Sequence, residues 1–134
     1  MQALVLIAHG SRRQASNQEV LDLASRLRQP AGDRYQLIKA GFLEIAEPSI
    51  PDAIETCIQS GATSIVVVPY FLAAGRHVAE DIPHIVKPVA EQHPQVKIRI
   101  SEHIGMSDSM TRLILDSASS DSAPVVDADM EQAS

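Results

Sequence analysis

The amino-acid sequence predicts a single-domain α/β protein, a three-layer sandwich in which helices cover both faces of a four-stranded parallel sheet. The chain has 134 residues, which is the size of one domain. Short apolar runs alternate four times with stretches of helical character, and this order is typical of parallel strands joined by helical crossovers. The residues are 45% hydrophobic but only 3% aromatic, so aliphatic side chains must form the core.

The first two strand–helix units follow from the order of apolar and turn residues. The continuous apolar run 3–8 is typical of a central parallel strand covered on both faces. The apolar residues that follow recur at helical spacing and predict a helix over 14–29, with a turn that begins at Pro30. A second strand is predicted over 35–43. The next helix opens at two prolines, which the first turn tolerates, and ends at Gly61, a suitable left-handed cap.

The third unit contains the clearest strand in the chain. Residues 64–69 are apolar and mostly β-branched, as in a buried strand. A loop that includes Gly75–His77 is expected to separate this strand from a third helix ending near Gln92. Pro83 is expected to make the start of that helix irregular, and Pro88 to kink it.

The last strand and helix complete the predicted domain, which spans residues 1–118. Alternating apolar and polar residues over 96–100 predict a half-exposed edge strand. Ser107 or Asp108 can cap a fourth helix after it. The segment 119–134 is rich in Ser, Ala and Asp and has no basic residue, so we expect an acidic, disordered tail.

Composition excludes several classes of protein. The formal net charge is −6 and the arginines are interspersed, so no basic face for nucleic acid is expected. The only cysteine is Cys57, which excludes a disulfide within the chain and a cysteine-based metal site. The run 3–8 is too short to span a membrane and has no basic segment before it. We therefore expect a cytoplasmic protein with no membrane partner.

Polar side chains follow each strand at the carboxyl edge of the predicted sheet, where ligands of open α/β folds bind. His9 follows the first strand, Glu44 the second, and His77 the loop after the third. Two imidazoles and one carboxylate would suit a borderline divalent ion and leave open coordination positions. The alternative for each residue is an ordinary loop or surface role, and the same holds for His103 after the fourth strand.

Six short segments also carry a family resemblance. In chain order they are Leu6–Arg12, Phe42–Glu44, Glu47–Pro51, Val68–Leu72, Gly75–Val78 and Asp81–Pro83. Together they resemble the short class II chelatases of the CbiX/SirB type, and the similarity covers roughly residues 3–105. The resemblance implies a chelatase-like fold with flavodoxin-like topology.

The resemblance further implies an enzyme, a metal-chelatase lyase that acts as a sirohydrochlorin ferrochelatase or cobaltochelatase. Such a protein inserts Fe²⁺, Co²⁺ or Ni²⁺ into the tetrapyrrole sirohydrochlorin, for siroheme or cobalamin-type cofactors. The metal is then a substrate, and no permanently bound cofactor is expected. By the same resemblance His9 and His77 are catalytic residues at the metal, with Glu44 as a further ligand. The longer members carry two such halves, so this chain resembles the short homodimeric members.

A tetrapyrrole has apolar faces and a carboxylate rim, so its site needs apolar walls and a few cationic or N–H donors. The candidate substrate-binding residues are Ser11, Arg12, Leu43, Tyr70, Phe71, Leu72 and Arg76. A different interpretation is a non-catalytic carrier of flavodoxin-like fold that binds the metal or the tetrapyrrole. A carrier would bind metal stoichiometrically and would not accelerate metallation.

Overall fold

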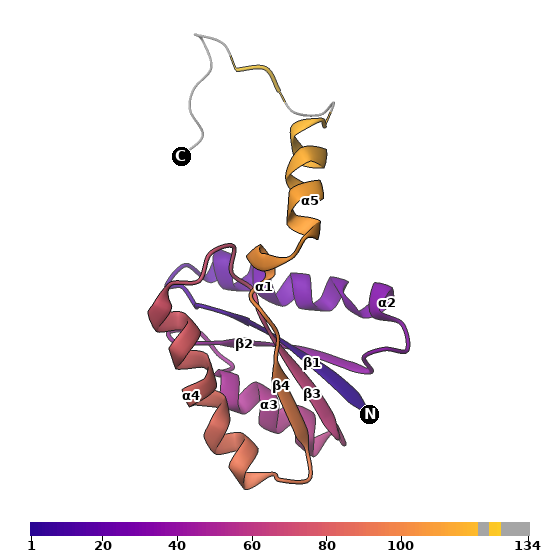
Figure 1. The fold of residues 1–134 in the computed structure, drawn as a ribbon, viewed down its shortest axis with the longest axis vertical. Helices are drawn as coiled ribbons and strands as arrows, with labels where there is room; N and C mark the ends of the chain where they lie inside the picture. Colours follow the sequence, from indigo (N-terminus) through magenta and orange to yellow (C-terminus); the bar gives the residue numbers. More distant parts are fainter. Residues whose placement is uncertain (121–123, 127–134) are drawn as a thin grey trace.

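The computed structural model describes residues 1–120 and 124–126 and contains one sheet of four parallel strands (Figure 1). The strand order is β2-β1-β3-β4. β1 (Gln2–Ala8) and β3 (Ser64–Pro69) form the centre, whereas β2 (Leu37–Phe42) and β4 (Lys97–Ile100) are the edges. This arrangement confirms three predictions: a parallel sheet, a first strand in its centre and a fourth strand at its edge.

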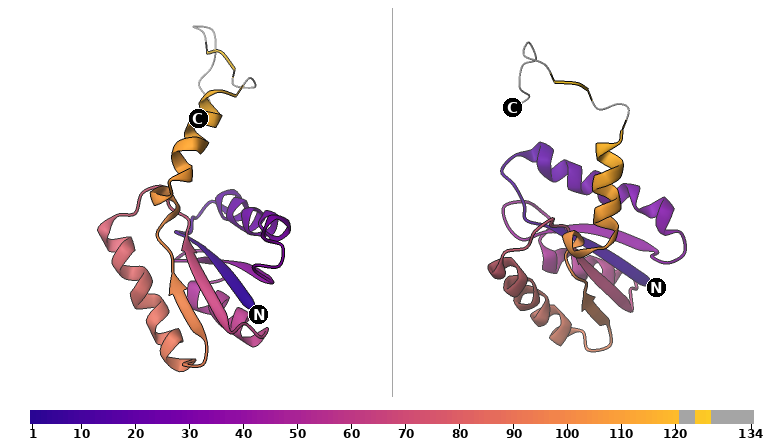
Figure 2. Two further views of the ribbon diagram at one scale, coloured as in Figure 1. Left: turned by 45° about the vertical axis from the view of Figure 1, so that its right-hand side comes forward. Right: turned by 45° about the horizontal axis from the view of Figure 1, so that its top comes forward.

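Helices cover both faces of the sheet, as the three-layer prediction requires. α1 (Gln14–Arg26) and α2 (Arg28–Ala31) pack on one face, while α3 (Ile50–Gln59) and α4 (Arg76–Gln92) pack on the other. After β4 the chain forms the short 3-10 helix η1 (Ile104–Met106) and then α5 (Ser109–Ala118). α5 extends away from the layered body, as Figure 1 and the left view of Figure 2 show.

The two faces of β1 explain why its sequence is continuously apolar. Val5 and Ile7 belong to the core cluster under α3 and α4, whereas Leu6 and Ala8 belong to the cluster under α1. Each is at most 7% exposed. A strand that is buried on both faces has no solvent-facing positions, so polar residues do not alternate with apolar ones. The run of apolar residues therefore follows from the central place of β1 in the sheet.

Pro51 lies in the first turn of α3 and Gly61 follows its end, as predicted, and the helix also has a side-chain cap that was not predicted. The Ser49 side chain caps the helix by accepting a hydrogen bond from the Asp52 N–H at 3.2 Å. Gly61 adopts the predicted positive φ, +104°. Cys57 is fully buried in the core, and this burial raises the pKa of its thiol to about 11, with Lys39 acting weakly in the opposite direction. The thiol is therefore protonated and inaccessible at neutral pH.

The third helix differs from the prediction. α4 is one continuous helix that includes Pro83 and Pro88, and Arg76 and His77 form its first turn instead of a loop. Both prolines are exposed, so the carbonyl groups that lose an intrahelical partner face water. The opposite side of the helix is buried in the core through Ile82, Val86 and Val89. This packing supports one continuous helix, where the two prolines predict an irregular start and a kink.

Other boundaries move by a few residues. The predicted helix over 14–29 is divided, because α1 ends at Arg26 and α2 follows as a separate short helix that includes Pro30. The predicted turn at Pro30 is therefore wrong by a few residues, and Gly32, with φ +56°, ends α2. β2 is shorter than the predicted strand over 35–43. Asp108 flanks α5 without a side-chain cap, and Ser107 instead accepts a hydrogen bond from the Ser109 N–H at 3.2 Å.

The C-terminal helix α5 has no buried residue. Its apolar side chains Leu113, Ile114 and Leu115 are 57–61% exposed. Its contacts are mainly with η1, the short helix that precedes it. Most of the predicted disordered tail, residues 121–123 and 127–134, lies outside the described residues. Over the part of the chain that the structure describes, no helix is long and apolar enough to cross a membrane.

Candidate metal-handling site

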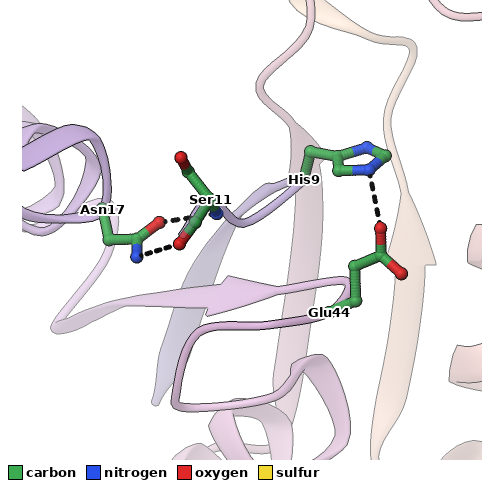
Figure 3. A network of polar contacts seen from close by, with 4 residues as sticks. All are labelled: His9, Ser11, Asn17 and Glu44. Atoms are coloured by element: carbon green, nitrogen blue, oxygen red, sulfur yellow. Dashed lines mark hydrogen bonds and ion pairs between the residues drawn. The ribbon is translucent and has the colours of Figure 1, made fainter. Parts of the chain in front are cut away.

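The side chains of His9 and Glu44 meet at the carboxyl edge of the sheet (Figure 3). His9 directly follows β1, and Glu44 lies two residues beyond β2. The parallel pairing of these strands continues past their ends, since the Leu43 N–H donates to Ala8 O at 3.0 Å and the Glu44 N–H donates to His9 O at 3.1 Å. This backbone ladder brings His9 Nε2 within 3.0 Å of Glu44 Oε1.

The pair is open to solvent and suited to exchange of a ligand. The His9 side chain is 56% exposed and that of Glu44 is 61% exposed. When the neutral imidazole donates its Nε2 proton to Glu44, its Nδ1 is free to accept a proton. When that proton leaves, Nε2 and Oε1 are spaced for a shared divalent ion, because ligand atoms about 2.0–2.2 Å from one ion lie roughly 3 Å apart. The pair can therefore bind a metal or move a proton.

A glycine makes this close approach possible. Gly10 has φ +96°, and a Cβ added to it would lie 1.8 Å from the Glu44 carbonyl oxygen. Only glycine combines that backbone conformation with that contact. Ile45, with φ +71°, turns the chain sharply after Glu44, and the Ala46 N–H donates to Glu44 O at 2.7 Å. The loops after β1 and β2 are thus packed backbone to backbone.

Asn17 on α1 holds the loop that follows His9, and sequence reasoning missed it. The Ser11 N–H donates to Asn17 Oδ1 at 2.9 Å, and Asn17 Nδ2 donates to Ser11 O at 2.7 Å (Figure 3). Ser11 Oγ accepts from the Arg13 N–H at 3.0 Å. The only signal in the sequence is a polar residue in the first turn of a helix that follows a histidine-bearing loop, which is common in unrelated proteins.

The residues predicted after the third strand lie at the same edge of the sheet. The Tyr70 N–H donates to Ile7 O at 2.7 Å, so Tyr70 directly continues the β1–β3 ladder. Tyr70 is 39% exposed and Leu72 is 73% exposed. Arg76 is also exposed, and its Nε contacts Glu80 Oε1 at 3.1 Å within α4. His77 is exposed on the first turn of α4.

The structure brings together two of the three predicted metal ligands. Within residues 1–120 and 124–126, no three His, Cys, Asp or Glu side chains converge into a group that could hold a metal ion. His77 therefore does not join His9 and Glu44 in this conformation. Leu43 and Phe71 are partly buried against the core under α3 and α4, so they offer less open surface than Tyr70 and Leu72.

Concave surfaces lie along the carboxyl edge of the sheet, although neither His9 nor Glu44 lines one of the three described below. On the α1 side, Ser11 and Arg12 line a polar cavity of about 380 Å³ together with Asn17 and Glu47. Beyond the ends of β3 and β4, His103 lies between two largely apolar cavities of about 280 and 580 Å³. The carboxyl edge therefore carries apolar hollows and polar groups close to the imidazole–carboxylate pair.

The chain is a single-domain α/β protein with an open parallel sheet, a class in which ligands bind at the carboxyl edge where this pair lies. The chain belongs to the CbiX family, whose family model matches residues 3–121. The predicted resemblance and the chelatase-like fold are thereby confirmed.

Comparison with known proteins agrees with this family. The chain is 38% identical over 93 residues to a sirohydrochlorin cobaltochelatase of Methanocaldococcus jannaschii, covering 69% of this chain and 64% of the relative. It is 35% identical over 118 residues to a sirohydrochlorin cobaltochelatase of Sulfolobus acidocaldarius, covering 88% of this chain and 90% of the relative.

A solved structure gives the same result. The sirohydrochlorin chelatase SirB from Bacillus subtilis subspecies spizizenii, in complex with cobalt, superposes with a TM-score of 0.74 at 29% identity. The match covers 85% of this chain but only 48% of SirB. The chain thus spans about half of SirB and less than two thirds of the Methanocaldococcus relative.

Proposed function

We propose that this protein is a sirohydrochlorin metallochelatase that inserts Fe²⁺, Co²⁺ or Ni²⁺ into the tetrapyrrole, for siroheme or cobalamin-type cofactors. The observation that carries the proposal is the exposed pair of His9 Nε2 and Glu44 Oε1, 3.0 Å apart, at the carboxyl edge of a CbiX-family sheet. The relatives named above are sirohydrochlorin chelatases, and one of them binds cobalt. The metal ion is a substrate in this reaction.

Metal insertion exchanges two protons for one divalent ion. Two pyrrole N–H bonds of the macrocycle break, their protons leave, and four ring nitrogens take the metal, so the charge on the ring is unchanged. A neutral imidazole can accept such a proton or release a bound metal. His9 has an accessible ring, and the carboxylate oxygen of Glu44 lies 3.0 Å from its Nε2. We assign it both tasks, with Glu44 as the second metal ligand.

The remaining predicted residues are assigned to the substrate. His77 is the second catalytic residue, and it lies on the first turn of α4 at the same edge as His9. Tyr70 and Leu72 offer exposed surface to an apolar macrocycle face. Arg12 and Arg76 offer cationic groups for its carboxylate rim. The free, buried Cys57 fits a reducing compartment, and we place the reaction in the cytoplasm.

The test is anaerobic metallation of sirohydrochlorin, followed by its visible spectrum, with each metal in turn and protein at one hundredth of the substrate concentration. We expect many turnovers per protein and a rate well above the uncatalysed one. A carrier would instead give a single stoichiometric binding event at the uncatalysed rate. That result would reject the enzyme and favour the carrier.

We further propose that the working unit is a homodimer, with the cleft between two copies. One copy presents a single wall to a macrocycle, and a two-fold pairing would supply the second wall. Support also comes from α5, a ten-residue helix with no buried residue and three exposed large apolar side chains. A helix this short is marginal by itself in water. We therefore add α5 to the surfaces expected at the contact, α4 and the loop 70–74.

Sedimentation velocity at assay concentrations tests the dimer. We expect the wild type to sediment as a dimer and Leu113→Asp to shift toward the monomer, because the carboxylate would be buried in an apolar contact. Arg112→Ala, on the same exposed helix, is the matched control and should remain dimeric. A monomeric wild type with full turnover would refute the shared cleft but leave the chelatase proposal in place.

A further inference from the structure

We propose that Asn17 is a positioning residue for the His9–Glu44 pair, acting through the backbone of the loop that joins β1 to α1. This inference rests on the proposed function for its catalytic consequence, but its structural claim can be tested without substrate. Asn17 lies on α1, is partly buried and does not contact either side chain of the pair.

Asn17 clamps the backbone of Ser11 through two hydrogen bonds. Its side-chain amide pairs with the backbone of Ser11 in both directions, accepting from the N–H at 2.9 Å and donating to the carbonyl at 2.7 Å. Two bonds on one residue fix the planes of both of its peptide units, which a single bond would leave free to rotate. Asparagine is suited to this, since its amide carries a donor and an acceptor side by side.

The clamp on Ser11 acts on His9 through the backbone. Only Gly10 separates them, and its conformational freedom would allow the loop to swing in the absence of other contacts. The clamp on Ser11 holds one end of Gly10, and the bond from the Glu44 N–H to His9 O at 3.1 Å holds the other. Gly10 is pressed against the Glu44 carbonyl between these two anchors. Loss of the clamp would therefore loosen the backbone contact that aligns His9 with Glu44.

Two substitutions of Asn17 separate its two hydrogen bonds. Asn17→Ala removes both bonds. Asn17→Asp keeps an acceptor for the Ser11 N–H but places a carboxylate oxygen against the Ser11 carbonyl, where a donor is needed. The rate of metal insertion should thus be highest with Asn at this position, lower with Asp and lowest with Ala. A role in helix stability alone would not produce this order, because aspartate in the first turn is favourable for a helix.

The matched control is His93→Ala at the opposite edge of the sheet. His93 Nε2 lies 2.8 Å from Glu55 Oε1, and the two side chains are 23% and 31% exposed. This contact joins the end of α4 to α3. Its loss should lower the melting temperature without altering the loop after β1, so it separates a stability effect from a positioning effect.

The experiment measures two quantities on the full chain. The first is amide hydrogen exchange at Glu44, whose N–H is bonded to His9 O, in the metal-free protein. We expect exchange at Glu44 to be about tenfold faster in Asn17→Ala and unchanged in His93→Ala. The second is kcat for metal insertion into sirohydrochlorin, which we expect to fall about 10- to 100-fold in Asn17→Ala and less in Asn17→Asp.

The outcomes separate this proposal from the proposed function. If the wild type shows no turnover, the chelatase proposal fails, and Glu44 exchange alone then decides whether the clamp positions His9. Unchanged Glu44 exchange in Asn17→Ala would refute the clamp. If the wild type is active, the clamp would also be refuted by Asn17→Ala and His93→Ala having equal kcat values at equal melting temperatures.

Discussion

Replacing Gly10 by alanine is expected to disrupt the His9–Glu44 pair and destabilise the domain. The added Cβ would lie 1.8 Å from Glu44 O, whereas real Cβ contacts essentially never fall below 3.0 Å, so this carbonyl must withdraw by about 1 Å. That movement breaks the 3.1 Å bond from the Glu44 N–H to His9 O. The φ of +96° adds about 1–2 kcal/mol of strain, and with one lost hydrogen bond the total is about 2–4 kcal/mol.

The assays for Gly10→Ala are urea denaturation and metal-insertion kinetics under native conditions. We expect turnover to fall about 100-fold, since an error near 1 Å in a catalytic group has an effect of this size. Gly61→Ala is the matched control. Its φ is +104°, but the nearest atom to an added Cβ is Met1 Cε at 4.0 Å. Gly61→Ala should therefore lose stability in urea through backbone strain but keep its turnover. Equal activity in Gly10→Ala and Gly61→Ala would refute the contact argument.

Four further predictions concern single features. His9→Ala and His77→Ala should each lower metal insertion about 100-fold or more with unchanged circular dichroism; near wild-type turnover would remove that histidine from the mechanism. Glu44→Gln should weaken metal affinity more than it lowers the rate, since the amide keeps the shape and loses the charge, and an unchanged affinity would argue against a ligand role. Deletion of 119–134 should leave the melting temperature and turnover unaltered, because the segment has little apolar surface to bury. Raising the pH from 9 to 11 should destabilise the wild type relative to Cys57→Ala by at most about 3 kcal/mol, whereas parallel pH profiles would contradict the assigned thiol pKa.

The sign of the Cys57 prediction follows from its burial. Removal of the thiol from water raises its pKa from 9.0 to about 11, so the folded protein holds the proton more tightly than the unfolded chain. This stabilisation is fully present below pH 9 and is lost as the pH rises toward 11. Alanine at this position has no proton to lose, so the difference between the two proteins isolates the thiol.

The sheet and the main site pair could be predicted from the sequence because both depend on local pattern and topology. The run 3–8 can be continuously apolar only where both faces of a strand are covered, which places it in the centre of the sheet. Once the first two strands are parallel neighbours, the residues that follow them must share one edge. His9 and Glu44 are brought together in this way, by main-chain pairing of the two strands that does not depend on particular side chains.

The features that sequence reasoning missed depend on tertiary contacts. The two prolines of α4 predict an irregular start and a kink, yet α4 is continuous from Arg76 to Gln92, with its apolar face buried in the core. The role of Asn17 depends on the path of the loop after His9, which is set by Gly10 and its contact with Glu44. The exposure of α5 depends on where the chain leaves β4, and its apolar residues alone would predict a buried helix.

The incomplete ligand set of the described site is consistent with the proposed function. A structural metal site surrounds its ion with four protein ligands, whereas a chelatase must release the ion to four ring nitrogens. One imidazole and one carboxylate, both more than half exposed, leave most coordination positions to water and to the incoming macrocycle. We therefore expect His77, the proposed third ligand, to act only while the substrate is bound. Loss of His77 should therefore affect insertion more than it affects binding of the free metal, and loss of Glu44 should do the reverse.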